Sequence, residues 1–144
     1  MEQKFDRLIF RTQPHWDESF MGYLLRLMEL NSYPTATWIL QFAKIRTIGQ
    51  GKLPFVFSGN LDLSHLSKLT LASEATLSAL LYHPAPEKKQ THGGNHMLFA
   101  KAVPQYLIRV NRPKVCSGCL RDSGYLRKIW EFSLLTACPI HVVC

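Results

Sequence analysis

The chain has 144 residues, which is enough for one or two small domains. Hydrophobic residues make up 47% of it, a share typical of globular proteins, and this excludes a chain that is disordered throughout. The longest apolar stretches are far too short to span a membrane, and the charged N-terminal residues are not followed by the apolar core of a signal peptide.

These features predict a cytoplasmic protein. The cytosol is reducing, so the four cysteines of the sequence are expected to bind metal rather than to form disulfides.

The net charge of +7 is concentrated in the last third of the sequence. Residues 1–96 carry ten Lys and Arg against eight Asp and Glu, a net +2, whereas residues 97–144 carry seven against two, a net +5. A clustered basic excess favours an anionic partner, most often nucleic acid, although a solubilising surface explains it equally well. We predict phosphate contacts that are strongly salt-dependent and indifferent to base sequence. The candidate residues are Arg109, Arg112, Lys114, Arg127 and Lys128.

The N-terminal part is predicted to be helical. Asp17 is a candidate N-cap, with Glu18 in the first turn, and Asn31 is a candidate stop. Arg26 and Glu29 lie on the polar face three residues apart, where a solvated ion pair contributes little. The apolar residues follow the spacing of one helix face: Phe20, Tyr23, Leu24, Leu27 and Met28.

A second helix is expected to begin with Pro34 in its first turn. Gly49, Gly51 and Pro54 then indicate a loop. The apolar face of this helix consists of Trp38, Ile39, Phe42 and Ile45.

Two further short helices are predicted between residues 61 and 83, and together they resemble a helix-turn-helix. Leu61, Leu63, Leu66 and Leu69 lie on the first. Ser73 is a candidate cap of the second, whose buried side carries Leu77, Leu80 and Leu81. Its one charged residue is Glu74, so we expect this helix to serve packing or protein contact rather than base recognition.

Residues 84–96 contain two prolines, a charge run and a glycine pair, a composition typical of a linker. We place a domain boundary here, between a helical N-terminal domain (1–96) and a basic zinc-binding module (97–144). His92 and His96 lie in this stretch without thiols or carboxylates that would complete a metal site, and we expect them to face solvent.

The strongest signal is a pair of two-ligand motifs, Cys-Ser-Gly-Cys at 116–119 and Cys-Pro-Ile-His at 138–141. Two-residue spacing lets both side chains of a tight turn reach one ion, and the 18 intervening residues suffice for a loop that returns to it. We predict one structural Zn²⁺ held by Cys116, Cys119, Cys138 and His141.

Other residues support or complicate this site. Gly118 is expected to supply unusual backbone angles, and Pro139 to stiffen the second turn. Tyr125, Trp130 and Phe132 are predicted to form the small core of the module, with a base-stacking role for Trp130 as the alternative. Cys144 is a fifth candidate ligand, which could replace His141 or be a spare thiol.

Two segments resemble the TniQ family. Pro14, Glu18, Ser19, Tyr23, Arg26 and Asn31 match the family's N-terminal motif P-x-x-x-E-S-x-x-x-Y-x-x-R-x-x-x-x-N, and we call these six the signature positions. The Cys pairs with Tyr125 and Trp130 between them resemble the family's first zinc-binding pattern, apart from Ser117 in place of the usual proline. The middle of the chain matches only loosely.

The resemblance implies a mainly α fold, in which a domain with a helix-turn-helix-like pair is followed by a Cys₃His zinc knuckle. It also implies a bacterial, DNA-associated role in transposition. Members of the family link a target-recognising element on DNA, in CRISPR-associated transposons an RNA-guided effector, to the AAA+ regulator TnsC. Relatives often continue into further Cys pairs, so the chain is expected to be either a minimal member or a truncated one.

An enzyme is not expected. The ten acidic residues are scattered, and neither a phosphate-binding Gly-rich loop nor a nucleophile elbow is present. A closed four-ligand site leaves no position for a reacting water. The prediction is therefore a non-catalytic targeting adaptor, and the alternative is a zinc-containing DNA-binding protein that selects the target or regulates transcription directly.

Overall fold

The computed structural model describes residues 7–45, 55–57, 61–86 and 94–141. This part of the chain is helix-rich, as predicted. Its α-helices are α1 (Phe20–Leu30), α2 (Thr37–Phe42), α3 (Ser64–Thr70), α4 (Glu74–Ser78) and α5 (Ser117–Ser123). An antiparallel hairpin pairs β1 (Asn95–Leu98) with β2 (Lys101–Pro104), and the 3-10 helices are η1 (Phe55–Phe57), η2 (Gln105–Leu107) and η3 (Lys128–Glu131).

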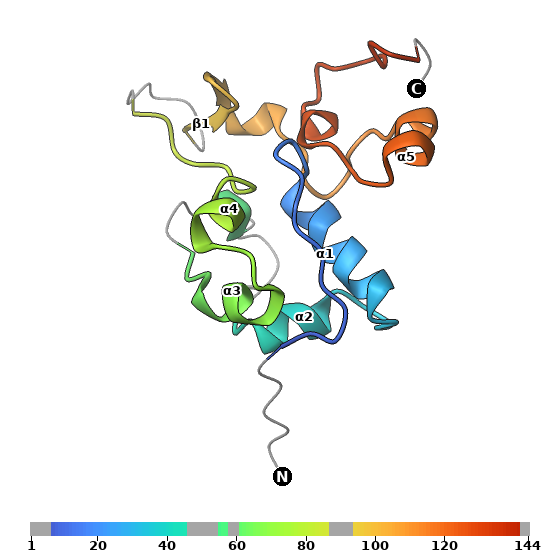
Figure 1. Ribbon diagram of the computed structural model, residues 1–144. Helices are drawn as coiled ribbons and strands as arrows, with labels where there is room; N and C mark the ends of the chain where they lie inside the picture. Colours follow the sequence, from blue (N-terminus) through green and yellow to red (C-terminus); the bar gives the residue numbers. More distant parts are fainter. Residues whose placement is uncertain (1–6, 46–54, 58–60, 87–93, 142–144) are drawn as a thin grey trace.

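The helices α1 to α4 follow one another in space, each against the next, and occupy the middle of Figure 1. The hairpin, α5 and the C-terminal segment lie above them. One apolar core joins the two halves, since Leu98, Val103, Ile108 and Val110 belong to the same buried cluster as the apolar faces of α1 to α4. The boundary predicted after residue 96 falls within β1, and the division into 1–96 and 97–144 remains a prediction.

Several predicted helix ends agree with the structure and others differ. Asn31 ends α1, and the hydroxyl of Ser73 caps α4 by accepting the N–H of Thr76 at 3.1 Å. The second helix begins at Thr37, so Pro34 precedes it rather than lying in its first turn. A left-handed residue, Leu71, separates α3 from α4, and the helix-turn-helix assignment of this pair stays a prediction.

The hairpin was not predicted, because residues 84–96 have the composition of a linker. His96 lies within β1 and is 5% exposed, with its ring edge-on to Phe57 at 4.9 Å between centroids. The expectation that His96 faces solvent is therefore wrong. His92, Gly49, Gly51 and Pro54 lie outside the described residues.

Ser19, not Asp17, caps α1. Its hydroxyl accepts the N–H of Gly22 at 3.0 Å, which satisfies one of the free donors of the first turn. Asp17 instead accepts a hydrogen bond from the Tyr125 hydroxyl at 2.7 Å. The predicted cap was wrong because Asp17 and Ser19 can both cap a helix, and the sequence alone does not choose between them.

Glu18 is completely buried and pairs with Arg26. The guanidinium donates from Nε and Nη2 to the two carboxylate oxygens at 2.7 and 2.8 Å, and the N–H of His15 donates at 3.0 Å. Nη2 also donates to the carbonyl of Gln13 at 3.0 Å. The predicted pairing of Arg26 with Glu29 is therefore wrong, since a buried carboxylate competes far better for the guanidinium than an exposed one.

Other signature positions fasten the same N-terminal segment to α1. Tyr23 is buried, which raises its pKa to about 12, and its hydroxyl donates to the carbonyl of Thr12 at 2.8 Å. The amide of Asn31 donates to the carbonyl of Phe10 at 2.9 Å and accepts the Phe10 N–H at 3.1 Å. These signature residues therefore have a structural role, because their hydrogen bonds hold the residues that precede α1 against the helix.

The segment before α1 pairs in turn with a segment more than one hundred residues later. The N–H of Ser19 donates to Leu126 O at 2.9 Å, and the N–H of Lys128 donates to Asp17 O at 2.7 Å. The Tyr125 ring stacks on His15 with 3.9 Å between centroids. This antiparallel contact, visible in Figure 1 where the blue segment meets the orange-red one, attaches the C-terminal part to the helices.

Gly22 makes this close approach possible. A Cβ atom at this position would lie 2.8 Å from the Cβ of Leu126 and 2.7 Å from the Ser19 hydroxyl oxygen. Both distances are too short for a Cβ atom, so any larger side chain here would displace Leu126 or Ser19, the N-cap of α1.

We predict that Glu18→Gln and Arg26→Met each lower the free energy of unfolding by about 3–5 kcal/mol, because each leaves a buried charged group without its partner. The double variant should lose less than the sum of the two single losses. Chemical denaturation followed by circular dichroism measures this, with Glu29→Gln, an exposed acid of α1, as the control. Losses below about 1 kcal/mol for the single variants would contradict the importance of the pair.

Candidate functional site

The four predicted metal ligands come together in the structure. Nδ1 of His141 lies 3.5, 3.4 and 3.6 Å from the sulfurs of Cys116, Cys119 and Cys138, and the last two sulfurs are 3.5 Å apart. All four donor atoms lie within 4.8 Å of one another. Donors bound tetrahedrally to zinc lie roughly 3.5–3.8 Å apart, given the usual Zn–S and Zn–N distances. The cluster therefore fits one metal ion.

Local structure explains how each pair of ligands meets. Cys116 is the N-cap of α5 and Cys119 lies in its first turn, so both thiols are on one side of the same helix end. In the second pair, the backbone N–H groups of Ile140 and His141 donate to Cys138 Sγ at 3.4 and 3.3 Å. Burial opposes the charged thiolate, but these donors lower the pKa of Cys138 to about 6 and favour the form that binds metal.

Gly118 serves the site in a different way from the one predicted. It lies within α5 and does not have a positive φ, so unusual backbone angles are not its role. A Cβ atom here would lie 2.8–3.0 Å from the ring of His141. The glycine is needed because the imidazole packs directly against the first turn of α5.

Asp122 contacts the cluster, although the sequence analysis did not single it out. Its carboxylate lies 3.0 Å from Nε2 of His141, on the side of the ring opposite Nδ1. A carboxylate in this position fixes the tautomer that carries hydrogen on Nε2 and leaves Nδ1 available to a metal. The hydrogen bond to His141 also lowers the pKa of Asp122. The one feature of the sequence that points to Asp122 is its spacing, three residues after Cys119.

The apolar support of the cluster is smaller than predicted. Trp130 is buried and forms a separate core with the three cysteines, beside the partly buried Ile129 and Leu135. Phe132 packs instead against the main core, and Tyr125 stacks on His15. Trp130 is 4% exposed, which leaves little face for a base to stack on. Cys144 lies outside the described residues.

The five predicted nucleic-acid contacts separate into two groups. Arg127 lies 3.9 Å from Asp17 and over the Tyr125 ring, at the junction with the N-terminal segment. Lys128 is 5% exposed, and its ammonium donates to the carbonyls of Ala79 and Leu81 at 3.2 and 2.8 Å. In this structure the Lys128 ammonium is therefore directed into the protein and away from any surface phosphate.

The remaining three cations, Arg109, Arg112 and Lys114, lie together on one loop. The N–H groups of Arg109 and Lys114 donate to the adjacent carbonyls of Glu131 and Trp130, at 2.7 and 3.0 Å. Residues 110–113 therefore loop out between two neighbouring anchor points. We call residues 109–114 the basic loop. Its three cations line a cavity of about 250 Å³, together with Trp130, Glu131 and Ser133.

Lys128 and Glu131 belong to a buried polar cluster with Tyr82. The Tyr82 hydroxyl donates to Glu131 at 2.9 Å, and the Lys128 ammonium lies 4.5 Å from the Tyr82 ring centroid. Burial raises the pKa of Glu131 to about 7 and lowers that of Lys128 to about 8. The Lys128 ammonium also lies at the carbonyl end of α4, where a cation is favourable.

The described chain is thus a small helix-rich protein with a Cys₃His cluster that can hold a metal ion. None of the described helices is long and apolar enough to cross a membrane. The TniQ family model matches residues 9–143, and the chain belongs to the TniQ family. Family membership implies involvement in the selection of transposition targets. No curated protein matches the sequence.

The raised pKa of Glu131 predicts a pH-dependent stability. Its folded-state pKa of about 7 exceeds the ordinary 4.5, so its contribution is complete below pH 4.5 and is lost as the pH rises to 7. Glu131→Gln should remove this decline, which amounts to at most about 3 kcal/mol. Urea denaturation between pH 4.5 and 8 measures the difference between the two proteins, with Glu29→Gln as the control. Parallel pH profiles for wild type and Glu131→Gln would contradict the prediction.

Proposed function

We propose that this protein is a non-catalytic adaptor that joins a target-recognition complex on DNA to the AAA+ regulator TnsC. The observation that carries the proposal is the TniQ match across nearly the whole chain, from residue 9 to residue 143. The proposal leaves open whether the recognising complex is an RNA-guided effector. The donor set of the metal cluster supports the absence of catalysis, because three thiolates and one imidazole occupy every position of a tetrahedral ion.

The ion that suits this cluster best is Zn²⁺, bound once per chain. Thiolate and neutral imidazole ligands at tetrahedral spacing are the preferred donors of structural zinc. In such a role the ion fastens α5 to the Cys138–His141 turn. Small zinc-binding modules gain roughly 10–16 kcal/mol of apparent folding free energy in this way.

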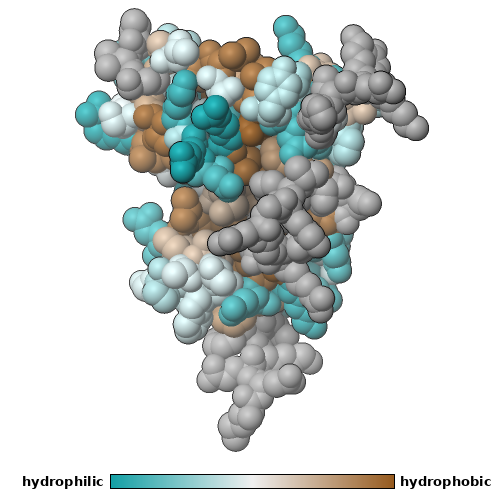
Figure 2. All heavy atoms as spheres, turned by 180° about the vertical axis from the view of Figure 1, so that it is seen from behind, coloured by the Kyte–Doolittle hydropathy of each residue, from teal (hydrophilic) through white to brown (hydrophobic). Residues whose placement is uncertain are grey.

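An exposed aromatic pair supports a protein contact. Trp16 is 80% and Phe99 45% exposed, and their ring centroids are 5.8 Å apart. Phe99 occupies the turn between β1 and β2 with a φ of 54°, a strained conformation for an aromatic residue. Figure 2 shows apolar atoms reaching the surface in the upper half of the face seen from behind. Large apolar groups at the surface are typical of proteins that bind other proteins.

The basic loop supports a contact with nucleic acid as part of the same function. Arg109, Arg112 and Lys114 are exposed cations on one short segment. This observation also favours the alternative function, in which the protein itself binds DNA to select the target or to regulate transcription. A charge-carrying loop of this kind binds phosphates with little base preference, which suits the adaptor better than a sequence-specific regulator.

The metal proposal predicts one zinc per chain in the purified protein, measured by elemental analysis. Cys116→Ser or Cys138→Ser should remove the metal and the solubility of the protein. Asp122→Asn should weaken zinc affinity by about 10- to 100-fold, because it removes the carboxylate that orients His141. Glu29→Gln, a change at an exposed acid of α1, is the control. Protein purified without zinc, or unchanged affinity in Asp122→Asn, would contradict the assignment.

The adaptor proposal predicts that targeted insertion in a reconstituted transposition reaction requires this chain. The purified chain should retain TnsC in a pulldown, and Trp16→Ser should weaken that retention. Leu134→Ser, at an apolar residue that is 61% exposed elsewhere on the surface, is the control. Insertion that proceeds equally well without the chain would refute the adaptor, and so would DNA cleavage or joining by the chain alone. Retention of target DNA but not of TnsC would favour the alternative.

A further inference from the structure

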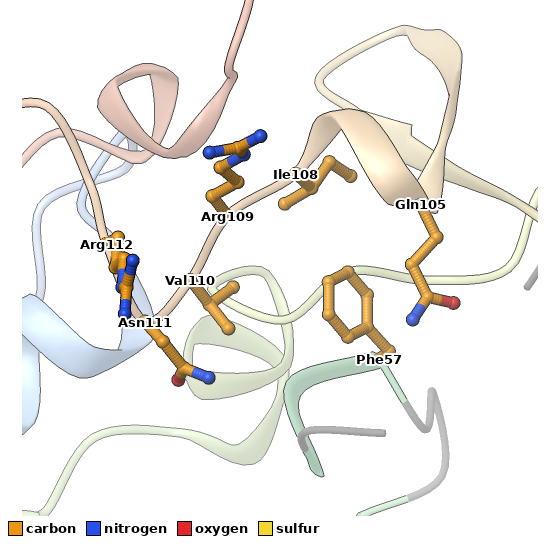
Figure 3. Close-up of a pocket in the computed structure, with 7 residues that line it drawn as sticks. All are labelled: Phe57, Gln105, Ile108, Arg109, Val110, Asn111 and Arg112. Carbon is orange, nitrogen blue, oxygen red and sulfur yellow. The ribbon is translucent and has the colours of Figure 1, made fainter. Parts of the chain in front are cut away.

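The basic loop separates two cavities and lines both. On one side is the polar cavity of about 250 Å³ described above, where Lys114 lies with Arg109 and Arg112. On the other side is a cavity of about 260 Å³, which is bordered by the same two arginines. Its remaining walls are Phe57, Ile108, Val110, Gln105 and Asn111 (Figure 3).

The first cavity has the chemistry of a phosphate site. The guanidinium groups of Arg109 and Arg112 form no hydrogen bond or ion pair with another described residue. The Lys114 ammonium lies 3.2 and 3.5 Å from the carbonyls of Ser133 and Leu135. The one carboxylate in the lining, Glu131, accepts a hydrogen bond from the Tyr82 hydroxyl. Three cations around one cavity, two of them able to bind an anion through paired N–H groups, suit a phosphate oxygen cluster.

The second cavity has the chemistry of a base site. Phe57, Ile108 and Val110 provide apolar walls, and Figure 3 shows them between the amides of Gln105 and Asn111. Gln105 and Asn111 contribute side-chain amides to the lining of this cavity. Side-chain amides present both donors and acceptors, as the edges of nucleobases require.

The two cavities are adjacent because Ile108 and Val110 turn inward while Arg109, Asn111 and Arg112 are exposed. A nucleotide is complementary to this pair of cavities. Its base is an apolar ring with a polar edge, and its phosphate is an anion beside that ring. A base can enter such a cavity only if it is unpaired and unstacked, since duplex DNA covers its faces.

We propose that the basic loop binds one unpaired nucleotide of a single-stranded nucleic acid, with the phosphate among Arg109, Arg112 and Lys114 and the base beside Gln105. This rests on the proposed nucleic-acid contact and makes it specific for a strand that is not in a duplex. The displaced or unpaired strand of a target-recognition complex has this chemistry, in either DNA or RNA.

The test is fluorescence anisotropy of the full, zinc-loaded chain with four short labelled probes of equal phosphate number. They are single-stranded RNA, single-stranded DNA, duplex DNA and a base-free (abasic) DNA strand. At equal salt, we expect a base-containing single strand to bind roughly tenfold more tightly than the duplex or the abasic strand. The preferred sugar identifies the natural strand as DNA or RNA.

Variants separate the two halves of the site. Gln105→Ala should weaken binding of the base-containing strands and leave the abasic strand unaffected. Arg109→Ala/Arg112→Ala should weaken all probes and reduce the slope of log affinity against log salt by about two. The control is Lys101→Ala/Arg121→Ala, which removes two exposed cations that line neither cavity.

Each outcome is decisive. Equal affinity for abasic and base-containing strands, or for duplex and single strand, would overturn the nucleotide site while leaving the phosphate contact standing. If Arg109→Ala/Arg112→Ala binds every probe as the control double variant does, both the nucleotide site and the proposed nucleic-acid contact are overturned.

Discussion

The buried carboxylate of Glu18 is the constraint on which the rest of the fold depends. A carboxylate without access to water must be fully hydrogen bonded, and Arg26 and the N–H of His15 meet that requirement. Arg26 is fixed on α1, so the segment before the helix has to lie along it. Residues 17–19 are thereby presented as an edge, and Leu126 and Lys128 bond to that edge.

This edge links the helices to the metal cluster and the basic loop. Residues 125–127 lead directly into η3, whose Trp130 and Glu131 carbonyls anchor the two ends of the basic loop. Trp130 also packs on the ligand cysteines. The positions of the Cys₃His cluster and the basic loop therefore depend on the same short segment, and Lys128 secures it further by reaching the carbonyl end of α4. A protein that holds partners in fixed relative positions benefits from such a connection.

The clustering of the four candidate metal ligands was predictable because the information is local. Two residues between ligands fix the geometry of each turn, whatever surrounds it, and the structure brings Cys116, Cys119, Cys138 and His141 together as expected. Asp122 was missed because a single acid carries no pattern. The nucleic-acid candidates were chosen by charge alone, and charge does not say which side chains are exposed. Lys128 proved to be buried, while Arg109, Arg112 and Lys114 share a cavity.

The sequence by itself determined the helical character of the N-terminal part, the family and the set of candidate metal ligands, because periodicity and short spacings depend on residues close in the chain. Tertiary structure alone decided that Ser19 caps α1, that Arg26 pairs with Glu18 rather than Glu29, and that Gly118 makes room for an imidazole. It also decided the β1–β2 hairpin and the two cavities beside the basic loop. These features arise because residues far apart in the sequence compete for burial and for hydrogen bonds. A local sequence pattern does not indicate which of them form the contact.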